Sequence, residues 1–167
     1  MAGLNKQWYA VYTAPRAEKK VSKRFTELEI EHYLPLQKVM RKWSDRLKEV
    51  EVPVMNGYIF VRVYKRDFDS VLKVFGALAF VKEFYKPVPI PEKQIELLKF
   101  MVEYSDERVE FSQDEYEIGK PVKITKGPLQ GLIGELLIRK GKHKVVIRID
   151  KFGCALTTVP TSFITKL

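Results

Sequence analysis

The chain has 167 residues, of which 31% are charged and 46% hydrophobic, and this composition is typical of one ordinary globular domain or two small ones, too apolar for a disordered chain. No apolar run approaches the ~20 residues that span a bilayer, and the N-terminus lacks the pattern of a signal peptide, so we expect a cytoplasmic protein without membrane contact. Cys154 is the only cysteine and the two histidines, His32 and His143, are far apart, which excludes an internal disulfide and disfavours zinc, so no metal or cofactor is expected.

Strand and helix patterns alternate over the first hundred residues. Residues 8–13 (WYAVYT) predict a strand, and apolar residues at positions 17, 21, 25 and 28 predict one face of a helix. A long basic β-hairpin is predicted over 33–54 with its turn at 43–46, followed by a strand over 57–64. A helix over 68–75, a strand over 78–84 and a helix beginning at Pro91 complete this part. Hairpins mixed with helices favour an α+β domain with a mainly antiparallel sheet and flanking helices.

Charge divides the chain into three parts. Residues 1–104 hold 19 basic and 13 acidic side chains, whereas residues 105–117 hold one basic and six acidic. Residues 118–167 hold ten basic and two acidic side chains, for a net charge of +8. An acidic stretch between two basic blocks predicts a linker at 105–117 between domains at 1–104 and 118–167, with an acidic surface loop inside one domain as the alternative.

The last fifty residues carry an all-β pattern. Short strands are predicted over 122–125, 133–138, 144–149, 155–159 and 163–166, with turns that contain glycine or proline between them. Five short strands in so small a block favour a β-barrel, because closure removes exposed strand edges. Leucines at 129, 132, 136 and 137 would permit some helix, but the β-branched residues around them favour strands.

No motif in the sequence indicates an enzyme. The phosphate-binding loop, the dinucleotide fingerprint, the zinc-protease motif and the nucleophile elbow are all absent. Asp67 and Asp69 fall early in a predicted helix, where carboxylates favour the positive end of the dipole. Cys154 is more readily explained as a small buried residue than as a nucleophile.

Basic residues instead point to a polyanionic partner. The net charge is +9, and such an excess attracts phosphate polyanions. The candidate nucleic-acid contacts lie on the first helix and on the hairpin, which Lys48 also lines: Arg16, Lys19, Lys20, Lys23, Lys38, Arg41, Lys42, Trp43 and Arg46. Glutamates are interspersed among them, so a solvated surface is the alternative for both clusters. Trp43 favours nucleic-acid binding over a solvated surface for the hairpin, because an aromatic side chain at an exposed tip can stack on a base.

Aromatic residues form a second candidate surface. In residues 57–64, Tyr58, Phe60, Arg62 and Tyr64 share one strand face, while the β-branched residues share the other and suit a core under the helices. The aromatic face is either covered by the chain itself or is a partner site, and the pattern alone leaves both possibilities open.

Three stretches resemble the NusG family of transcription elongation factors. Residues 8–20 (WYAVYTAPRAEKK) and 52–61 (VPVMNGYIFV) are similar to its N-terminal domain, and residues 118–136 (IGKPVKITKGPLQGLIGEL) are similar to its KOW motif. The resemblance implies an N-terminal domain with an antiparallel sheet and flanking helices, followed by an SH3-like KOW β-barrel. The order of the motifs and their occurrence in two domains make the resemblance specific.

The resemblance also implies a partner and a mode of action. The family's N-terminal domain binds the clamp helices of RNA polymerase and opposes the clamp opening that accompanies pausing, while its basic surface lies near the DNA of the elongation complex. The positions that match the family's hydrophobic patch, with two aromatic residues that would complete it, are Met55, Tyr58, Phe60, Phe80 and Phe84. A monomer is expected, with a ribosomal protein or another factor as the partner of the KOW domain.

Two features resemble specialised members of the family rather than the housekeeping factor. Residues 34–53 are similar to the UpxY antiterminators of capsule-polysaccharide operons and, more distantly, to RfaH. Residues 152–160 (FGCALTTVP) depart from the housekeeping pattern, which puts the partners Rho and the ribosomal protein in doubt. The alternative function is a ribosome-associated KOW-type RNA-binding protein.

Overall fold

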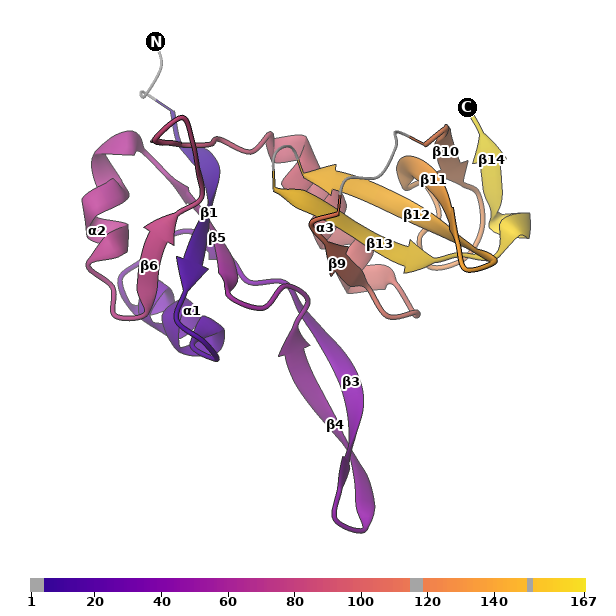
Figure 1. The fold of residues 1–167 in the computed structure, drawn as a ribbon, viewed down its shortest axis with the longest axis horizontal. Helices are drawn as coiled ribbons and strands as arrows, with labels where there is room; N and C mark the ends of the chain where they lie inside the picture. The colour runs from indigo at the N-terminus through magenta and orange to yellow at the C-terminus, as the bar shows by residue number, and fades with distance from the viewer. Residues whose placement is uncertain (1–4, 115–118, 150–151) are drawn as a thin grey trace. The chain divides into compact units, whose positions relative to one another are not determined.

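The computed structural model describes residues 5–114, 119–149 and 152–167, which form two compact units (Figure 1). The first unit takes in the chain up to Pro35 together with Met55–Glu92, and the second takes in Leu36–Val54 together with Lys93–Leu167. No helix in the described ranges is both long enough and apolar enough to cross a membrane. The mixture of strands and helices confirms the α+β class that the sequence predicts.

A four-stranded antiparallel sheet organises the first unit, in the order β2-β5-β1-β6. Its strands are β1 (Gln7–Thr13), β2 (His32–Tyr33), β5 (Tyr58–Val63) and β6 (Ala77–Phe80). Its helices are α1 (Glu18–Glu27), the 3-10 turn η1 (Lys65–Asp67) and α2 (Phe68–Leu72). All three predicted segments 8–13, 57–64 and 17–28 therefore fold as expected, whereas the second helix is shorter than expected.

One face of this sheet packs against the helices. Ile59, Val61 and Val63 of β5 lie in one buried cluster with residues of both helices and their flanks, among them Val21, Phe25, Val71 and Val74. This arrangement confirms the prediction that the β-branched face of β5 is the core face. Glu18 fastens α1 to the sheet, because its buried carboxylate accepts a 2.8 Å hydrogen bond from the Gly57 backbone N–H at the start of β5. Gly57 has a φ of +84°, a conformation that glycine adopts without strain.

A small hairpin replaces part of the strand predicted over 78–84. β6 ends at Phe80, and β7 (Lys82–Glu83) pairs with β8 (Lys86–Pro87) around a turn made by Phe84 and Tyr85. The prediction of one continuous strand is wrong here because the chain leaves the sheet after Val81, whose N–H donates to the carbonyl of Ala10. Both turn residues have positive φ, which the sequence did not indicate because neither is glycine or asparagine.

The second unit contains a two-stranded hairpin, a helix and a six-stranded antiparallel sheet of order β14-β10-β11-β12-β13-β9. The hairpin and helix are β3 (Leu36–Trp43), β4 (Arg46–Pro53) and α3 (Glu92–Tyr104). The sheet contains β9 (Glu110–Ser112), β10 (Pro121–Ile124), β11 (Ile133–Arg139), β12 (Lys142–Ile149), β13 (Gly153–Thr158) and β14 (Ile164–Lys166), with the 3-10 turn η2 (Thr161–Phe163) before β14.

The C-terminal block is all-β, as its sequence predicts. Each of the five predicted strands is present within one or two residues, and residues 133–139 and 142–149 are strand rather than helix. A sixth strand, β9, pairs with β13 and comes from the segment 105–117 that the charge pattern marks as a linker. Gly127 sits in the turn between β10 and β11 with a φ of +83°, and a Cβ at this position would lie 2.7 Å from the ring of Phe163.

Candidate nucleic-acid interface

The hairpin β3–β4 carries the highest density of candidate contacts, and its register sorts them onto two faces. Residues directly opposite each other in an antiparallel pair project to the same side. Arg41 pairs with Lys48 and Trp43 pairs with Arg46, so these four residues share one face with Val39 and Val50, which we call the Trp43 face. Lys38 pairs with Glu51 and Met40 with Glu49, so the opposite face, the Glu49 face, carries Lys38, Met40, Lys42, Leu47, Glu49 and Glu51.

The Trp43 face carries three cations and no carboxylate. Arg41 and Lys48 lie directly opposite each other, an arrangement of like charges that destabilises a hairpin unless an anion lies over it. Trp43 is 53% exposed, and the Lys48 ammonium lies 4.8 Å from the centroid of its ring. Exposed cations beside an exposed indole combine phosphate contact with base stacking, so this face can bind a nucleic acid.

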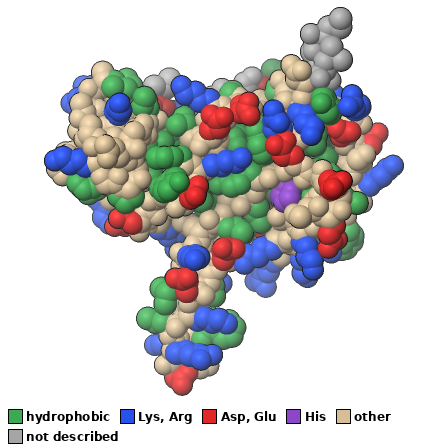
Figure 2. Space-filling view, turned by 180° about the vertical axis from the view of Figure 1, so that it is seen from behind, with side chains coloured by type: hydrophobic (Ala, Val, Ile, Leu, Met, Phe, Trp, Pro, Cys, Tyr) green, Lys and Arg blue, Asp and Glu red, His purple; other side chains and the backbone are tan. Residues whose placement is uncertain are grey.

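The Glu49 face has a balanced charge. Lys38 lies 3.8 Å from Glu49, and both side chains are well exposed, so the ion pair adds little stability. Lys38 and Lys42 therefore stand among glutamates, and the structure does not bring them together with Arg41 and Arg46 on one surface. Lys and Arg side chains along the hairpin are visible in Figure 2, interleaved with hydrophobic ones. Lys48 was missing from the candidate set, although alternation across the predicted turn would have placed it beside Trp43.

The basic residues of α1 form a separate row in the first unit. Lys19, Lys20 and Lys23 are exposed on the helix, and Arg16 precedes it with a φ of 59°. Arg24, the next cation on the helix, has a structural contact instead. Its guanidinium donates a 2.7 Å hydrogen bond to the carbonyl of Phe75 and lies 5.2 Å from the centroid of the Phe75 ring.

The five candidate polymerase contacts occupy three different environments. Met55 and Phe60 are buried, and Phe60 stacks with Tyr33 at a centroid distance of 6.4 Å. Tyr58 is half-buried, on the same side of the sheet as Phe60. Phe84 is 86% exposed at the β7–β8 turn, beside Tyr85.

Phe80 lies on the opposite side of the sheet from Phe60. It pairs with Val11, a core residue, and its ring lies 4.6 Å from that of Phe68 and 5.9 Å from that of Tyr9. The expected patch joining Phe80 to Phe60 is therefore not a single surface, because the alternation of side chains along β6 turns Phe80 toward the helices.

Tyr12 extends the aromatic side of β5, and sequence reasoning missed it. It pairs with Tyr58 in the sheet, and their rings are 5.1 Å apart. Burial and the neighbouring Tyr58 raise the pKa of the Tyr12 hydroxyl, so the Tyr12 phenol is neutral at physiological pH. The two tyrosines form a partly exposed aromatic pair that can anchor a protein partner.

The other reactive side chains have structural contacts. Cys154 is buried, and burial raises the pKa of its thiol, which keeps it protonated. One ring nitrogen of His32 lies 2.8 Å from the Ser22 hydroxyl and the other lies 2.8 Å from the Ile30 carbonyl. Among the described residues, no group of three His, Cys, Asp or Glu side chains is placed to hold a metal ion.

Comparisons with known proteins show which family the chain resembles over most of its length. Residues 6–99 match the family model NusG, described as transcription termination factor nusG. The chain is similar to the transcription termination/antitermination protein NusG of Rickettsia prowazekii, 25% identical over 162 residues that cover 90% of this chain and 84% of that protein. It is also similar to the protein of the same name from Chlamydia pneumoniae, 27% identical over 156 residues that cover 86% of this chain and 85% of that protein. Among solved structures, the one titled "Domain interaction in Thermotoga maritima NusG" has a TM-score of 0.56 at 20% identity, covering 99% of both chains.

Proposed function

Because the chain belongs to the NusG family of transcription termination and antitermination factors, which are not enzymes, we propose that it binds the clamp helices of RNA polymerase through its N-terminal domain and suppresses pausing or termination. The observation that carries this proposal is the partly exposed pair Tyr12 and Tyr58 on the aromatic side of the sheet, within the residues that match the family model. Aromatic anchors of this kind dominate the binding energy of many protein interfaces.

The polymerase-binding surface in this proposal consists of the aromatic residues on one side of the first sheet and at the β7–β8 turn. In this surface Tyr12 and Tyr58, whose rings contact each other, touch the polymerase directly, and Phe84 adds an exposed ring. Met55 and Phe60 are buried and support the surface from below. Phe80 is left out, since it faces the helices.

The DNA of the elongation complex is the second partner that we propose. The Trp43 face of the hairpin meets its phosphates and stacks on an unpaired base, and the α1 row of Arg16, Lys19, Lys20 and Lys23 adds electrostatic attraction. The factor needs no covalent step, because binding the closed clamp more tightly than the open clamp shifts the polymerase population toward the closed state.

We further propose that the chain is a specialised family member, similar to UpxY and RfaH, that acts on long operons such as capsule-polysaccharide clusters. The hairpin supports this idea, because its Trp43 face presents three cations and an indole without a carboxylate. Such a face can read an unpaired strand in addition to binding phosphates. As working boundaries we propose an N-terminal domain at 1–104, a connecting segment at 105–117 that includes β9, and a KOW domain at 118–167.

The KOW domain is proposed to bind a ribosomal protein or another factor, and the protein is proposed to act as a cytoplasmic monomer. The excess positive charge of residues 118–167 also favours a second candidate function, binding of ribosomal RNA by a ribosome-associated protein. The second function would leave the aromatic side of the first sheet without a role.

Binding of the full-length chain to core RNA polymerase tests the proposal. We expect Phe84→Ala and Tyr58→Ala each to weaken binding by about 2 kcal/mol, the range of interface anchors. Phe75→Ala is the matched control, because Phe75 is 81% exposed and lies outside the proposed surface. If the wild-type chain binds polymerase and none of the three substitutions weakens binding, the aromatic surface is not the polymerase contact. Co-sedimentation with ribosomes but not with polymerase would favour the second candidate.

A further inference from the structure

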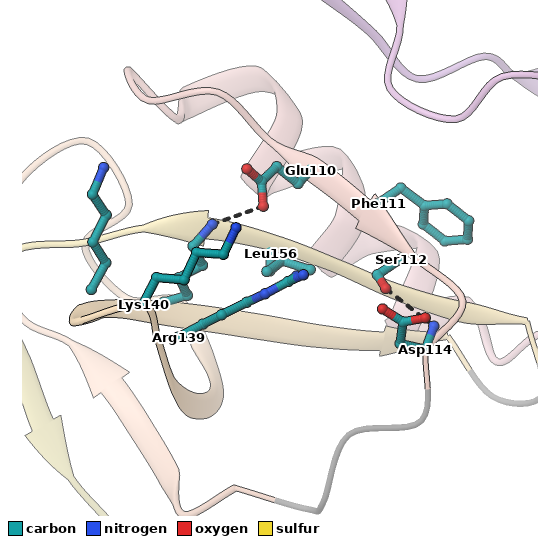
Figure 3. A pocket seen from close by; sticks show the side chains of 9 residues that line it. Glu110, Phe111, Ser112, Asp114, Arg139, Lys140 and Leu156 are labelled. Atoms are coloured by element: carbon teal, nitrogen blue, oxygen red, sulfur yellow. Dashed lines mark hydrogen bonds and ion pairs between the residues drawn. The ribbon is translucent and has the colours of Figure 1, made fainter.

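A hollow of about 530 Å³ lies in the second unit, beside the turn that joins β11 to β12. Its lining includes four cations and two carboxylates: Arg139, Lys140, Lys142, Lys144, Glu110 and Asp114. Leu156 of β13 and Phe111 of β9 contribute apolar surface to it. Figure 3 shows the side chains of Arg139 and Lys140 extending over this hollow, Lys140 toward Glu110 and Arg139 toward the side of Leu156 and Asp114.

Part of the charge in the hollow is neutralised internally. The Lys144 ammonium lies 2.7 Å from a Glu110 carboxylate oxygen, and Lys144 is buried. These two charges therefore neutralise each other at one side of the hollow. Among the described residues, no carboxylate forms an ion pair with Lys140 or Lys142. The four cations of the lining outnumber its two carboxylates, so the hollow carries an excess of positive charge that attracts an anion.

The turn itself holds a cation in an unfavourable backbone conformation. Lys140 and Gly141 have φ values of 50° and 75°, which is the pattern of a two-residue hairpin turn that normally carries Asn-Gly. A lysine at the first of these positions is less stable than an asparagine, because its side chain lacks the local hydrogen bonds that favour the left-handed region. Backbone strain of this kind is more frequent at functional sites than elsewhere.

We propose that this hollow binds the phosphodiester backbone of a single-stranded nucleic acid. Arg139, Lys140 and Lys142 surround a concave site, and the apolar surface of Leu156 and Phe111 lies beside them. A volume of this size accommodates a nucleotide of a single strand, whereas a rigid duplex cannot enter it. The site is separate from the Trp43 face and lies outside residues 6–99 that match the family model, so it adds a second nucleic-acid contact to the proposed function.

The test measures binding of the full-length chain to fluorescein-labelled U12 RNA and dT12 DNA by fluorescence anisotropy at several salt concentrations. The variant Arg139→Gln/Lys140→Gln/Lys142→Gln should bind at least about tenfold more weakly at low salt, and the slope of log K against log salt should fall by about 2, since each phosphate contact on a single strand contributes about 0.7. The matched control, Lys120→Gln/Lys123→Gln/Lys126→Gln, removes the same charge from exposed positions outside the hollow and should change the affinity less than about twofold.

A second variant separates binding from folding. Lys140→Asn places the favoured residue in the turn, so it should raise the thermal midpoint of unfolding while it weakens binding to U12. Tighter binding of U12 than of dT12 would identify RNA as the ligand, and equal affinities would identify the shared phosphodiester backbone. Losses of equal size in the triple variant and in its matched control would overturn the proposal, because only net charge would then matter.

The hollow and the hairpin can be told apart in the same assay. The triple variant should show its full loss in a background that carries Arg41→Gln/Lys48→Gln, because the two surfaces share no residue and their effects should add. A loss that disappears in this background would assign the binding to the hairpin and overturn the proposal for the hollow. Inorganic phosphate should compete with U12 only weakly, since it supplies one anion rather than a chain of them.

Discussion

The Trp43 face and the Glu49 face of the hairpin offer a direct test of the nucleic-acid interface, because they carry similar numbers of cations in opposite surroundings. Arg41→Gln/Lys48→Gln removes two charges from the face without a carboxylate, and Lys38→Gln/Lys42→Gln removes two charges from the face with Glu49 and Glu51. Net charge falls by the same amount in both variants. A difference in DNA binding between them therefore reports the arrangement of the charges.

The expected magnitude follows from counterion release. Each phosphate contact with duplex DNA contributes about 0.9 to the slope of log K against log salt, so the loss of two contacts on the Trp43 face should lower the slope by about 1.8. Relative to a 1 M reference, this amounts to about 60-fold in affinity at 0.1 M salt, or about 2.5 kcal/mol. The Glu49-face variant should lose much less, because Lys38 is already paired with Glu49 at 3.8 Å.

Fluorescence anisotropy with a labelled DNA that contains an unpaired bubble measures both slopes between about 50 and 300 mM salt. Trp43→Ala in the same assay should weaken binding to the unpaired strand by about 1–3 kcal/mol and leave binding to a fully paired duplex nearly unchanged, because stacking needs an exposed base. Equal slopes for the two double variants would refute the division into faces. An equal effect of Trp43→Ala on both DNAs would refute the stacking role of the indole.

Three further predictions concern stability and its relation to binding. Phe25→Ala, which removes a fully buried ring from the core of the first unit, should lower the free energy of unfolding by about 3–5 kcal/mol in urea titration, and a value below about 1 kcal/mol would contradict the core assignment. Lys144 lowers the pKa of Glu110, chiefly through a hydrogen bond, so this pair contributes stability above the ordinary glutamate pKa that is lost as the pH falls through the lowered value. Lys144→Met should therefore flatten the dependence of thermal stability on pH below the ordinary glutamate pKa of 4.5. Phe84→Asn/Tyr85→Gly replaces two left-handed aromatic residues by the favoured turn pair, so it should raise the thermal midpoint and weaken polymerase binding, and a fall in the midpoint would show that the turn is not strained.

Most helices and strands could be predicted from short sequence patterns, because burial of one face of an element determines which of its own residues are apolar. The alternation in β5 identified its core face, and the spacing of Val21 and Phe25 identified α1, since burial on one side of an element imposes its period on the sequence. The β7–β8 hairpin escaped prediction because its turn has no glycine or asparagine. β9 escaped because a three-residue edge strand in an acidic segment has too short a pattern to detect, and only its pairing with β13 defines it.

The candidate surfaces were harder to predict because they depend on register. The sequence identifies the basic residues of the hairpin, but the separation of Arg41 and Arg46 from Lys38 and Lys42 requires the pairing across the turn. Likewise, Phe80 and Phe60 are equally aromatic in the sequence, and only the pairing of Phe80 with Val11 shows that they face opposite sides. A one-residue change in register would exchange these faces, so composition alone cannot assign them.

The β7–β8 and β11–β12 hairpin turns carry side chains that a stable turn would avoid. Phe84 and Tyr85 in one unit and Lys140 in the other occupy left-handed positions where Asn or Gly is more stable, and both turns border a surface proposed for binding. Left-handed backbone at non-glycine residues costs about 1–3 kcal/mol each, which selection for stability alone would remove. In a protein that acts only by binding, exposed rings and cations at such turns contact the partners, and this function explains why the less stable residues are kept. The two variants that relax these turns, Lys140→Asn and Phe84→Asn/Tyr85→Gly, should therefore each gain stability and lose a different partner.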